Sequence, residues 1–192
     1  GSLPGPASSI SPWLDSRLIP LELVLGQLEA QEHRRYIKSH LPLDGLPFFE
    51  NIKYICVTRD ARDVFMSLLN HWGNHTEEFY STINGVYGLV GEPLPRFVDD
   101  TKAIWRDWIT RGASEWETQG YPYWSHLDHA LSFWKYRSLP NIMMLHYADL
   151  LKDLDGEMRR IADYLEIDVP EDQWPDVVKR CTFAEVKKNP DT

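Results

Sequence analysis

Apolar side chains recur along the chain in two patterns, and these patterns predict its main elements. Leucine and valine at helical spacing predict an amphipathic helix over 18–32, whereas 54–57 and 141–146 are short continuous apolar runs, typical of parallel strands buried on both faces. A helical pattern follows each run, over 60–69 and 154–165, and further helices are predicted over 97–109, 127–134 and 174–180. Strands that alternate with helices predict an α/β fold in which helices flank a parallel β-sheet.

Two segments have weaker patterns. Residues 36–38 predict a short additional strand with His40 at its end, and the glycine-rich and proline-rich stretch 81–95 predicts a long loop. Ligands of parallel α/β proteins collect beyond the carboxyl ends of the strands. His40, Arg59 and Tyr147 are all expected at those ends.

Composition narrows the class of protein. The 192 residues are 43% hydrophobic and 26% charged, which fits a single globular domain. A net charge of −9 makes nucleic acid and anionic membranes poor partners. The two cysteines fit a reducing compartment, and the apolar runs are shorter than the ~20 residues of a membrane span. We therefore predict a cytoplasmic protein that binds neither nucleic acid nor a membrane.

The start of the chain has a different character. It opens with Gly-Ser and continues through a stretch rich in proline and serine, so 1–12 is predicted to be a flexible start or a cloning scar. Residues 13–192 are predicted to form one α/β domain.

A polar stripe interrupts the otherwise apolar helix predicted after the first strand. Arg59 follows the strand, and Asp60, Asp63, Ser67 and Asn70 lie on the helix. An arginine fork and a serine hydroxyl could together bind a phosphate. From the spacing alone, a solvated face with Arg59 paired to Asp63 is the favoured alternative.

Lys38 and His40 occupy alternate positions, so on an extended segment their side chains point the same way. A histidine with a pKa near ~6.5 can take a proton from a hydroxyl, and a lysine beside it can neutralise developing charge. The alternative is a loop histidine beside a surface lysine.

Two further groups of residues have ordinary structural interpretations. His71 and His75 are four apart, as metal ligands can be, but no third ligand is evident and no metal site is predicted. The tryptophans between 105 and 134 are predicted to be mostly core, with some lining an acceptor pocket.

Read in order, four segments resemble the sulfotransferases that use 3′-phosphoadenosine 5′-phosphosulfate (PAPS). Residues 37–42 resemble the family's histidine motif, with Ser39 in place of threonine. The run 54–67 resembles its strand and helix for the 3′-phosphate, and 141–150 is similar to its segment with an adenine-contacting tyrosine. Residues 181–190 resemble its Thr-Ser-Phe segment, with Cys181 in place of threonine.

The resemblance implies a P-loop-kinase-like sulfotransferase architecture, PAPS as co-substrate and no metal. It also implies roles for six side chains, namely His40 as general base, Lys38 as support for the transferring group, Arg59 and Ser67 as ligands of the 3′-phosphate, and Tyr147 and Phe183 as contacts of the adenine.

The function expected from this resemblance is transfer of a sulfuryl group from PAPS to a small acceptor alcohol or phenol, aromatic or apolar. Nothing before Trp13 matches the family's 5′-phosphosulfate loop, and its C-terminal Arg-Lys-Gly loop is not found before Thr192. The domain is therefore expected to be incomplete, and a catalytically impaired nucleotide-binding or scaffold protein is the alternative. A phosphotransferase is a weaker alternative function, because no glycine-rich loop with lysine is present. The sequence leaves open whether the protein forms a homodimer.

Overall fold

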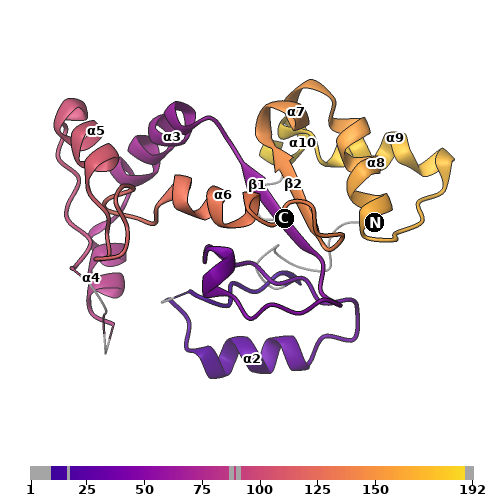
Figure 1. Ribbon diagram of the computed structural model, residues 1–192, viewed down its shortest axis with the longest axis horizontal. Helices are drawn as coiled ribbons and strands as arrows, with labels where there is room; N and C mark the ends of the chain where they lie inside the picture. The colour runs from indigo at the N-terminus through magenta and orange to yellow at the C-terminus, as the bar shows by residue number, and fades with distance from the viewer. Residues whose placement is uncertain (1–9, 17, 87–88, 90–91, 189–192) are drawn as a thin grey trace.

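The centre of the fold is a parallel pair of strands. The structure is a computed structural model that describes residues 10–16, 18–86, 89 and 92–188 (Figure 1). Strand β1 (Tyr54–Thr58) pairs with β2 (Ile142–His146), so that the last residues of the two strands lie side by side. The predicted parallel α/β arrangement is therefore confirmed. Because the strands are parallel and in register, Arg59 and Tyr147 leave the sheet at the same edge.

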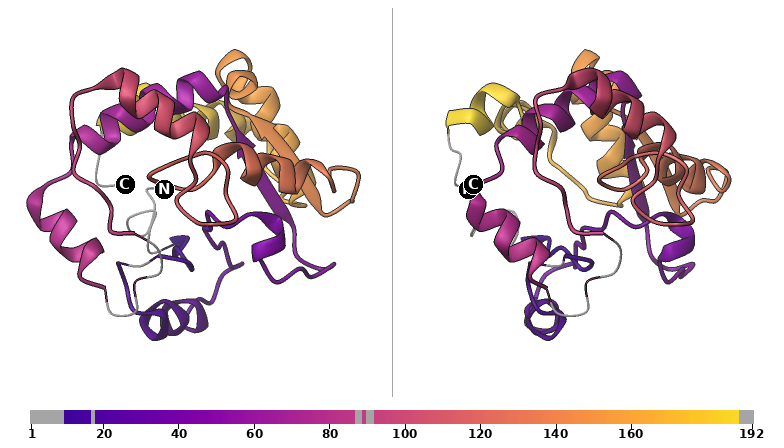
Figure 2. Two further views of the ribbon diagram at one scale, coloured as in Figure 1. Left: turned by 60° about the vertical axis from the view of Figure 1, so that its left-hand side comes forward. Right: turned by 90° about the vertical axis from the view of Figure 1, so that its left-hand side faces the viewer.

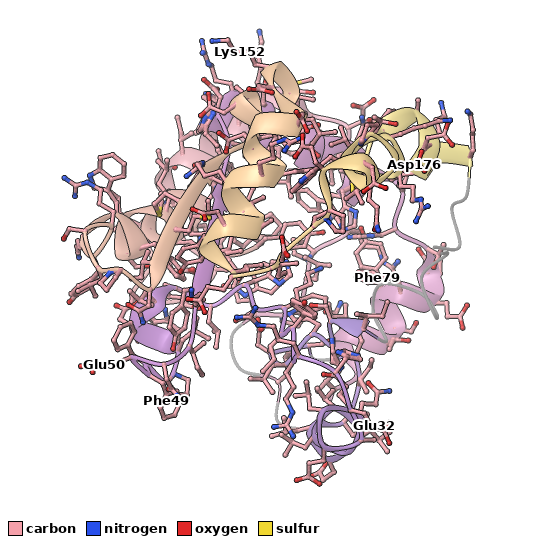
Figure 3. All side chains as sticks on the ribbon, turned by 90° about the vertical axis from the view of Figure 1, so that its right-hand side faces the viewer. Glu32, Phe49, Glu50, Phe79, Lys152 and Asp176 are labelled. Atoms are coloured by element: carbon pink, nitrogen blue, oxygen red, sulfur yellow. The ribbon has the colours of Figure 1, made fainter. Side chains whose placement is uncertain are left out.

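Helices surround this pair of strands (Figure 1). Helix α2 (Leu21–Glu29) precedes β1, and the connection to β2 contains α3 (Ala61–Gly73), α4 (Glu77–Asn84), α5 (Thr101–Thr110) and α6 (His126–Trp134). After β2 come α7 (Tyr147–Lys152), α8 (Leu154–Tyr164), α9 (Trp174–Arg180) and α10 (Phe183–Lys188), with short 3-10 turns at Leu43–Gly45 and Glu171–Gln173. In Figure 3, Lys152 at the end of α7 and Glu32 beyond α2 lie at opposite ends of the molecule.

Two apolar clusters hold the helices in place. In the first, Phe133 of α6 packs with Cys56 and Ile142 against one face of the sheet. The second joins helices α3, α4 and α5, which Figure 2 shows beside the sheet. It consists of the buried side chains Phe65, Trp72, Tyr80, Ile104 and Trp108.

Three expectations about local structure were wrong. The apolar run 54–57 is not buried on both faces, since Ile55 is 37% and Val57 53% exposed. From α8, Tyr164 donates a hydrogen bond to the carbonyl of Tyr54 at the start of β1, and Arg160 donates to the carbonyl of Met144 in β2. Further along β1, the described residues leave the side chains of Ile55 and Val57 partly exposed. Residues 36–38 form no strand of the sheet. The predicted loop 81–95 begins inside α4, which starts with Thr76 as its side-chain cap.

The ends of the chain are only partly described. Of the predicted flexible start, 1–9 lie outside the described residues, as do Asn189 and Pro190 of the segment that begins at Cys181. Pro12 is fully buried. Within the described part, no helix combines the length and the apolar character needed to cross a membrane.

Candidate active site

Arg59 and Tyr147 meet at the carboxyl edge of the sheet. The guanidinium of Arg59 lies 4.6 Å from the centre of the Tyr147 ring. Its Nε is 3.7 Å from an Asp63 carboxylate oxygen, and the side chains are 35% and 61% exposed. An ion pair this exposed contributes only ~0–1 kcal/mol. The predicted pairing with Asp63 therefore exists, but it is weak.

The Arg59 Nε atom is itself buried, and it has no hydrogen-bond partner among the described residues. A guanidinium carries five N–H donors in a rigid fork. A buried donor without a partner costs ~1–3 kcal/mol, which an anionic oxygen would recover. The geometry thus favours an anion beside Arg59.

A hollow of about 660 Å³ adjoins this arginine. Arg59, Ser67 and Asn70 line one wall of it, and Phe97 and Thr101 line the other. Arg59 and Ser67, which are eight residues apart, therefore line the same cavity, as the sequence suggested for a phosphate site. The Ser67 side chain is exposed and accessible to a ligand there.

The second predicted pair, Lys38 and His40, is framed by two indole rings. The His40 ring stacks on Trp124 with 4.9 Å between the ring centres and 10° between the planes. Trp13 contacts the same imidazole at 4.5 Å and lies 4.9 Å from the Lys38 Nζ atom. The buried Nδ1 atom of His40 has no hydrogen-bond partner in the described part of the chain. The ring is therefore held by aromatic contacts and by its backbone.

The surroundings of His40 favour its neutral form. Burial lowers the pKa of His40 below its ordinary value, the positive charge of Lys38 lowers it further, and Asp15 opposes both. A neutral imidazole at pH 7 can accept a proton, as a general base must.

Helix α6 connects the two parts of the site. His126, its first residue, places Nε2 2.9 Å from the carbonyl oxygen of Arg59, to which it donates a hydrogen bond. His129 lies one turn further on, where burial lowers its pKa most, followed by the charges of His126 and His40. The helix therefore bridges the arginine at the strand end and the histidine between the two indoles.

The loop that presents Trp124 depends on a glycine. Gly120 has a φ of +103°, and a Cβ at this position would lie 2.6 Å from the Cα of Ser125. The positive φ and the close approach of Ser125 each exclude a residue larger than glycine at this position. Gly120 thus allows the close turn that brings Trp124 against His40.

Phe183 and several of the tryptophans are exposed. Phe183 begins α10 and is 78% exposed, without a ring contact to Tyr147 in the described structure. The tryptophans are not mostly core: Trp108 is buried, but Trp116 is 77% and Trp134 53% exposed.

The pair His71 and His75 has a structural explanation. Their rings lie 4.6 Å apart, and the Nε2 atom of His75 is 2.6 Å from the Tyr123 hydroxyl. Among the described residues, no group of three or more potential ligands could hold a metal ion.

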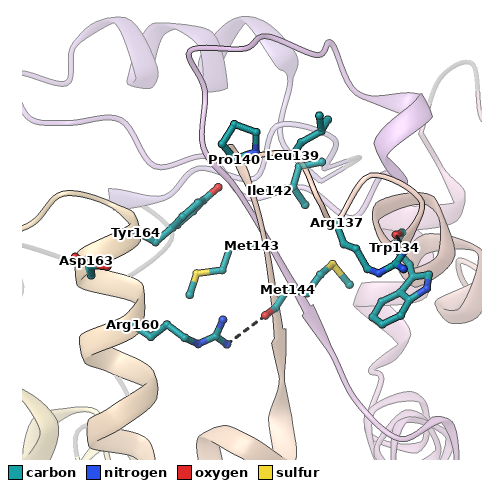
Figure 4. Close-up of a pocket in the computed structure, with 10 residues that line it drawn as sticks. All are labelled: Trp134, Arg137, Leu139, Pro140, Ile142, Met143, Met144, Arg160, Asp163 and Tyr164. Carbon is teal, nitrogen blue, oxygen red and sulfur yellow. Dashed lines mark hydrogen bonds between the residues drawn. The ribbon is translucent and has the colours of Figure 1, made fainter.

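A second hollow, of about 570 Å³, lies beside β2 and is lined in part by α8 (Figure 4). Its two arginines already have partners. Arg160 donates to the carbonyl of Met144 and to Glu157, and Arg137 donates to the carbonyl of Trp134. The arginines of this hollow are therefore less available to bind an anion than Arg59 is.

Several residues of the site could not be predicted from the sequence. Trp13 and Asp15 reach His40 because two irregular segments meet, which no periodic pattern signals. His126 lies one residue before the helix predicted over 127–134, and nothing in the sequence indicated its hydrogen bond to Arg59.

Acidification is expected to destabilise the fold through three histidines. Burial lowers the pKa values of His40, His75 and His129. Because the unfolded chain then binds more protons, their contribution to stability is present above the ordinary pKa of ~6.5 and is lost as the pH falls through the lowered values. Urea unfolding should give a lower free energy at pH 5.5 than at pH 7.5, and His75→Gln should reduce the difference. Equal free energies at both pH values would contradict this.

Arg59 and Tyr147 follow the ends of the two parallel strands, Ser67 lines the hollow beside Arg59, and His40 lies in a separate segment between two indole rings. An α/β framework with an arginine and a cavity at its strand ends suits an anionic ligand. The family model described as sulfotransferase domain matches residues 3–192. The chain belongs to the sulfotransferase family.

Relatives and solved structures agree with this assignment. A glycolipid sulfotransferase of Mycobacterium bovis is 36% identical over 195 residues, covering 94% of this chain and 60% of the relative. Sulfotransferase 2A6 of Rattus norvegicus is 28% identical, with 94% and 56% covered. A crystal structure of retinol dehydratase with androsterone and inactive cofactor PAP matches with a TM-score of 0.60 and 26% identity, over 88% of this chain and 44% of that one. The chain thus spans less than two thirds of the length of each of these proteins.

Proposed function

We propose that this site transfers a sulfuryl group from PAPS to a hydroxyl group of an acceptor. The observation that carries the proposal is the buried Arg59 Nε atom without a hydrogen-bond partner, in a described hollow that also contains Ser67. A cation with spare donors suits the phosphate that distinguishes PAPS from simpler adenine nucleotides.

Arg59 and Ser67 would hold the 3′-phosphate, and the Tyr147 ring, already stacked on the guanidinium, would contact the adenine. Phe183 is proposed as a second adenine contact. Its high exposure leaves its ring accessible, and α10 would have to approach Tyr147 for both to act together. The crystal structure of retinol dehydratase, which matches this chain at 26% identity, contains PAP. This similarity supports the proposal of a nucleotide site.

PAPS, when bound, supplies the sulfuryl group, whose bond to the phosphate oxygen breaks as the bond to the acceptor oxygen forms. His40 takes the proton from the acceptor hydroxyl through its neutral ring. Lys38 carries the positive charge that faces the developing negative charge on the transferring group. Trp13 and Trp124 exclude water from the imidazole face.

For the acceptor, we propose a hydroxyl group on an apolar molecule. Trp124, which is 43% exposed, offers an aromatic surface beside His40. The mycobacterial relative is named for glycolipids, and the retinol dehydratase structure contains androsterone. A lipid-linked sugar is therefore the first class to test, ahead of the small alcohol or phenol that the sequence suggested.

The pH dependence of turnover tests the role of His40. A base must be unprotonated, so the rate rises with pH through its pKa. Since the pKa of His40 is lowered, the acid limb of kcat/KM should lie below the ordinary value of ~6.5. The measurement uses the full-length gene product, with rates corrected for the folded fraction at each pH. An acid limb above pH 7 would argue against His40 as the base.

A further inference from the structure

Two irregular segments lie against each other beside the proposed base. The backbone N–H of Lys38 donates to the carbonyl of Pro12, and that of Leu14 donates to the carbonyl of Lys38, both at 3.0 Å. Together they form an isolated parallel bridge between 12–15 and 38–40. The earlier segment thus fixes the later one at the level of the backbone.

Two side chains of the earlier segment, Trp13 and Asp15, add further contacts. The Trp13 ring lies 4.5 Å from the His40 ring and 4.9 Å from the Lys38 Nζ atom. Both carboxylate oxygens of Asp15 accept from the backbone N–H of His40, at 3.1 and 3.3 Å. A charge-assisted hydrogen bond of this kind is about twice as strong as a neutral one.

We propose that Asp15 is a positioning residue of the site, which holds the backbone of His40 while Trp13 orients its ring, and that 12–15 acts as a clamp on 38–40. This inference rests on the proposed function, because it assigns a role in presenting the base of that reaction. The clamp is a contact between segments that have no regular secondary structure of their own. Without it, 38–40 loses these backbone hydrogen bonds and keeps the stacking of His40 on Trp124.

Asp15 also acts on the charge of the base. Among the described residues, the charged or titratable groups that act on His40 are Lys38 from its own segment, Asp15 from the clamp and His129 from α6, while the loop after Gly120 contributes the uncharged Trp124. Of these, only Asp15 favours the protonated form. Without its charge, burial and Lys38 would act unopposed, and the pKa of His40 would fall further.

A histidine titration of the 192-residue chain tests this directly, because it needs no turnover. We would follow the His40 ring by NMR in the parent, in Asp15→Asn and in Glu22→Gln. Asparagine keeps a carbonyl acceptor for the His40 N–H but removes the charge, and Glu22→Gln removes one exposed negative charge from α2 as a matched control. We expect a lower His40 pKa in Asp15→Asn and the parental value in Glu22→Gln.

Kinetics of the full-length gene product test the positioning role. Small displacements of a catalytic group can reduce the rate by up to roughly 100-fold, so Asp15→Ala should lower kcat to this extent with little change in the KM for PAPS. Asp15→Asn should keep most of the kcat at pH 8 and move the acid limb to lower pH. A parental His40 pKa in Asp15→Asn, or a parental kcat in Asp15→Ala, would overturn the proposal. If the parent protein transfers no sulfuryl group, the proposed function fails, and the titration decides on Asp15 by itself.

Discussion

Replacing His40 by alanine is expected to lower kcat roughly 10²- to 10⁴-fold, the usual contribution of a general base. The affinity for adenosine 3′,5′-bisphosphate (PAP) should stay at the parental value, because the proposed nucleotide contacts come from other side chains, namely Arg59, Ser67, Tyr147 and Phe183. Initial rates with PAPS and calorimetric titration with PAP measure the two quantities separately.

The matched control is His33→Ala, which removes an exposed histidine from the segment after α2. It should leave both kcat and PAP affinity unchanged. A His40→Ala protein that retains the parental kcat would exclude this residue as the base. Loss of PAP affinity together with kcat would mean that His40 supports the nucleotide site rather than the proton transfer.

Replacing Arg59 by alanine is expected to weaken PAP binding by roughly 10- to 100-fold, since hydrogen bonds to charged groups contribute ~1.5–3 kcal/mol. Binding of 5′-AMP, which lacks the 3′-phosphate, should change little. The reason is the position of the guanidinium: it lines the hollow with Ser67, and its buried Nε has no hydrogen-bond partner among the described residues.

The neighbouring Arg62 provides the control for Arg59. It is exposed and bonded to the Asp60 carboxylate at 2.9 Å, and it does not line the hollow. Arg62→Ala removes the same charge and should retain PAP affinity. Equal losses in the two variants would indicate a general effect of charge, and no loss in Arg59→Ala would remove the 3′-phosphate site from this cavity.

The parts of this site that depend on local sequence could be predicted. The apolar run of β1, the capping Asp60 and the helical spacing after it place Arg59 and Ser67 on one cavity wall. In the same way, Tyr147 follows β2 directly, so parallel pairing brings it beside Arg59. Each of these positions follows from the period of a strand or a helix.

The parts that depend on contacts between distant segments could not be predicted. An apolar run indicates a strand but not how many of its faces are covered, so the exposure of Val57 was missed. Of residues 36–38, Lys38 forms an isolated bridge with Trp13 instead of joining the sheet. The neighbours of His40 come from three separate parts of the chain, which residue spacing does not encode.

The central claim, that this is a sulfuryl-transfer site, is tested most directly by product formation. The full-length gene product would be incubated with PAPS radiolabelled on sulfur and with a glycolipid, a sterol or a phenol as acceptor. We expect a labelled sulfate ester of at least one acceptor, formed together with an equal amount of PAP and lost in His40→Ala. Tight binding of PAP without any labelled product would contradict it and would favour a nucleotide-binding scaffold.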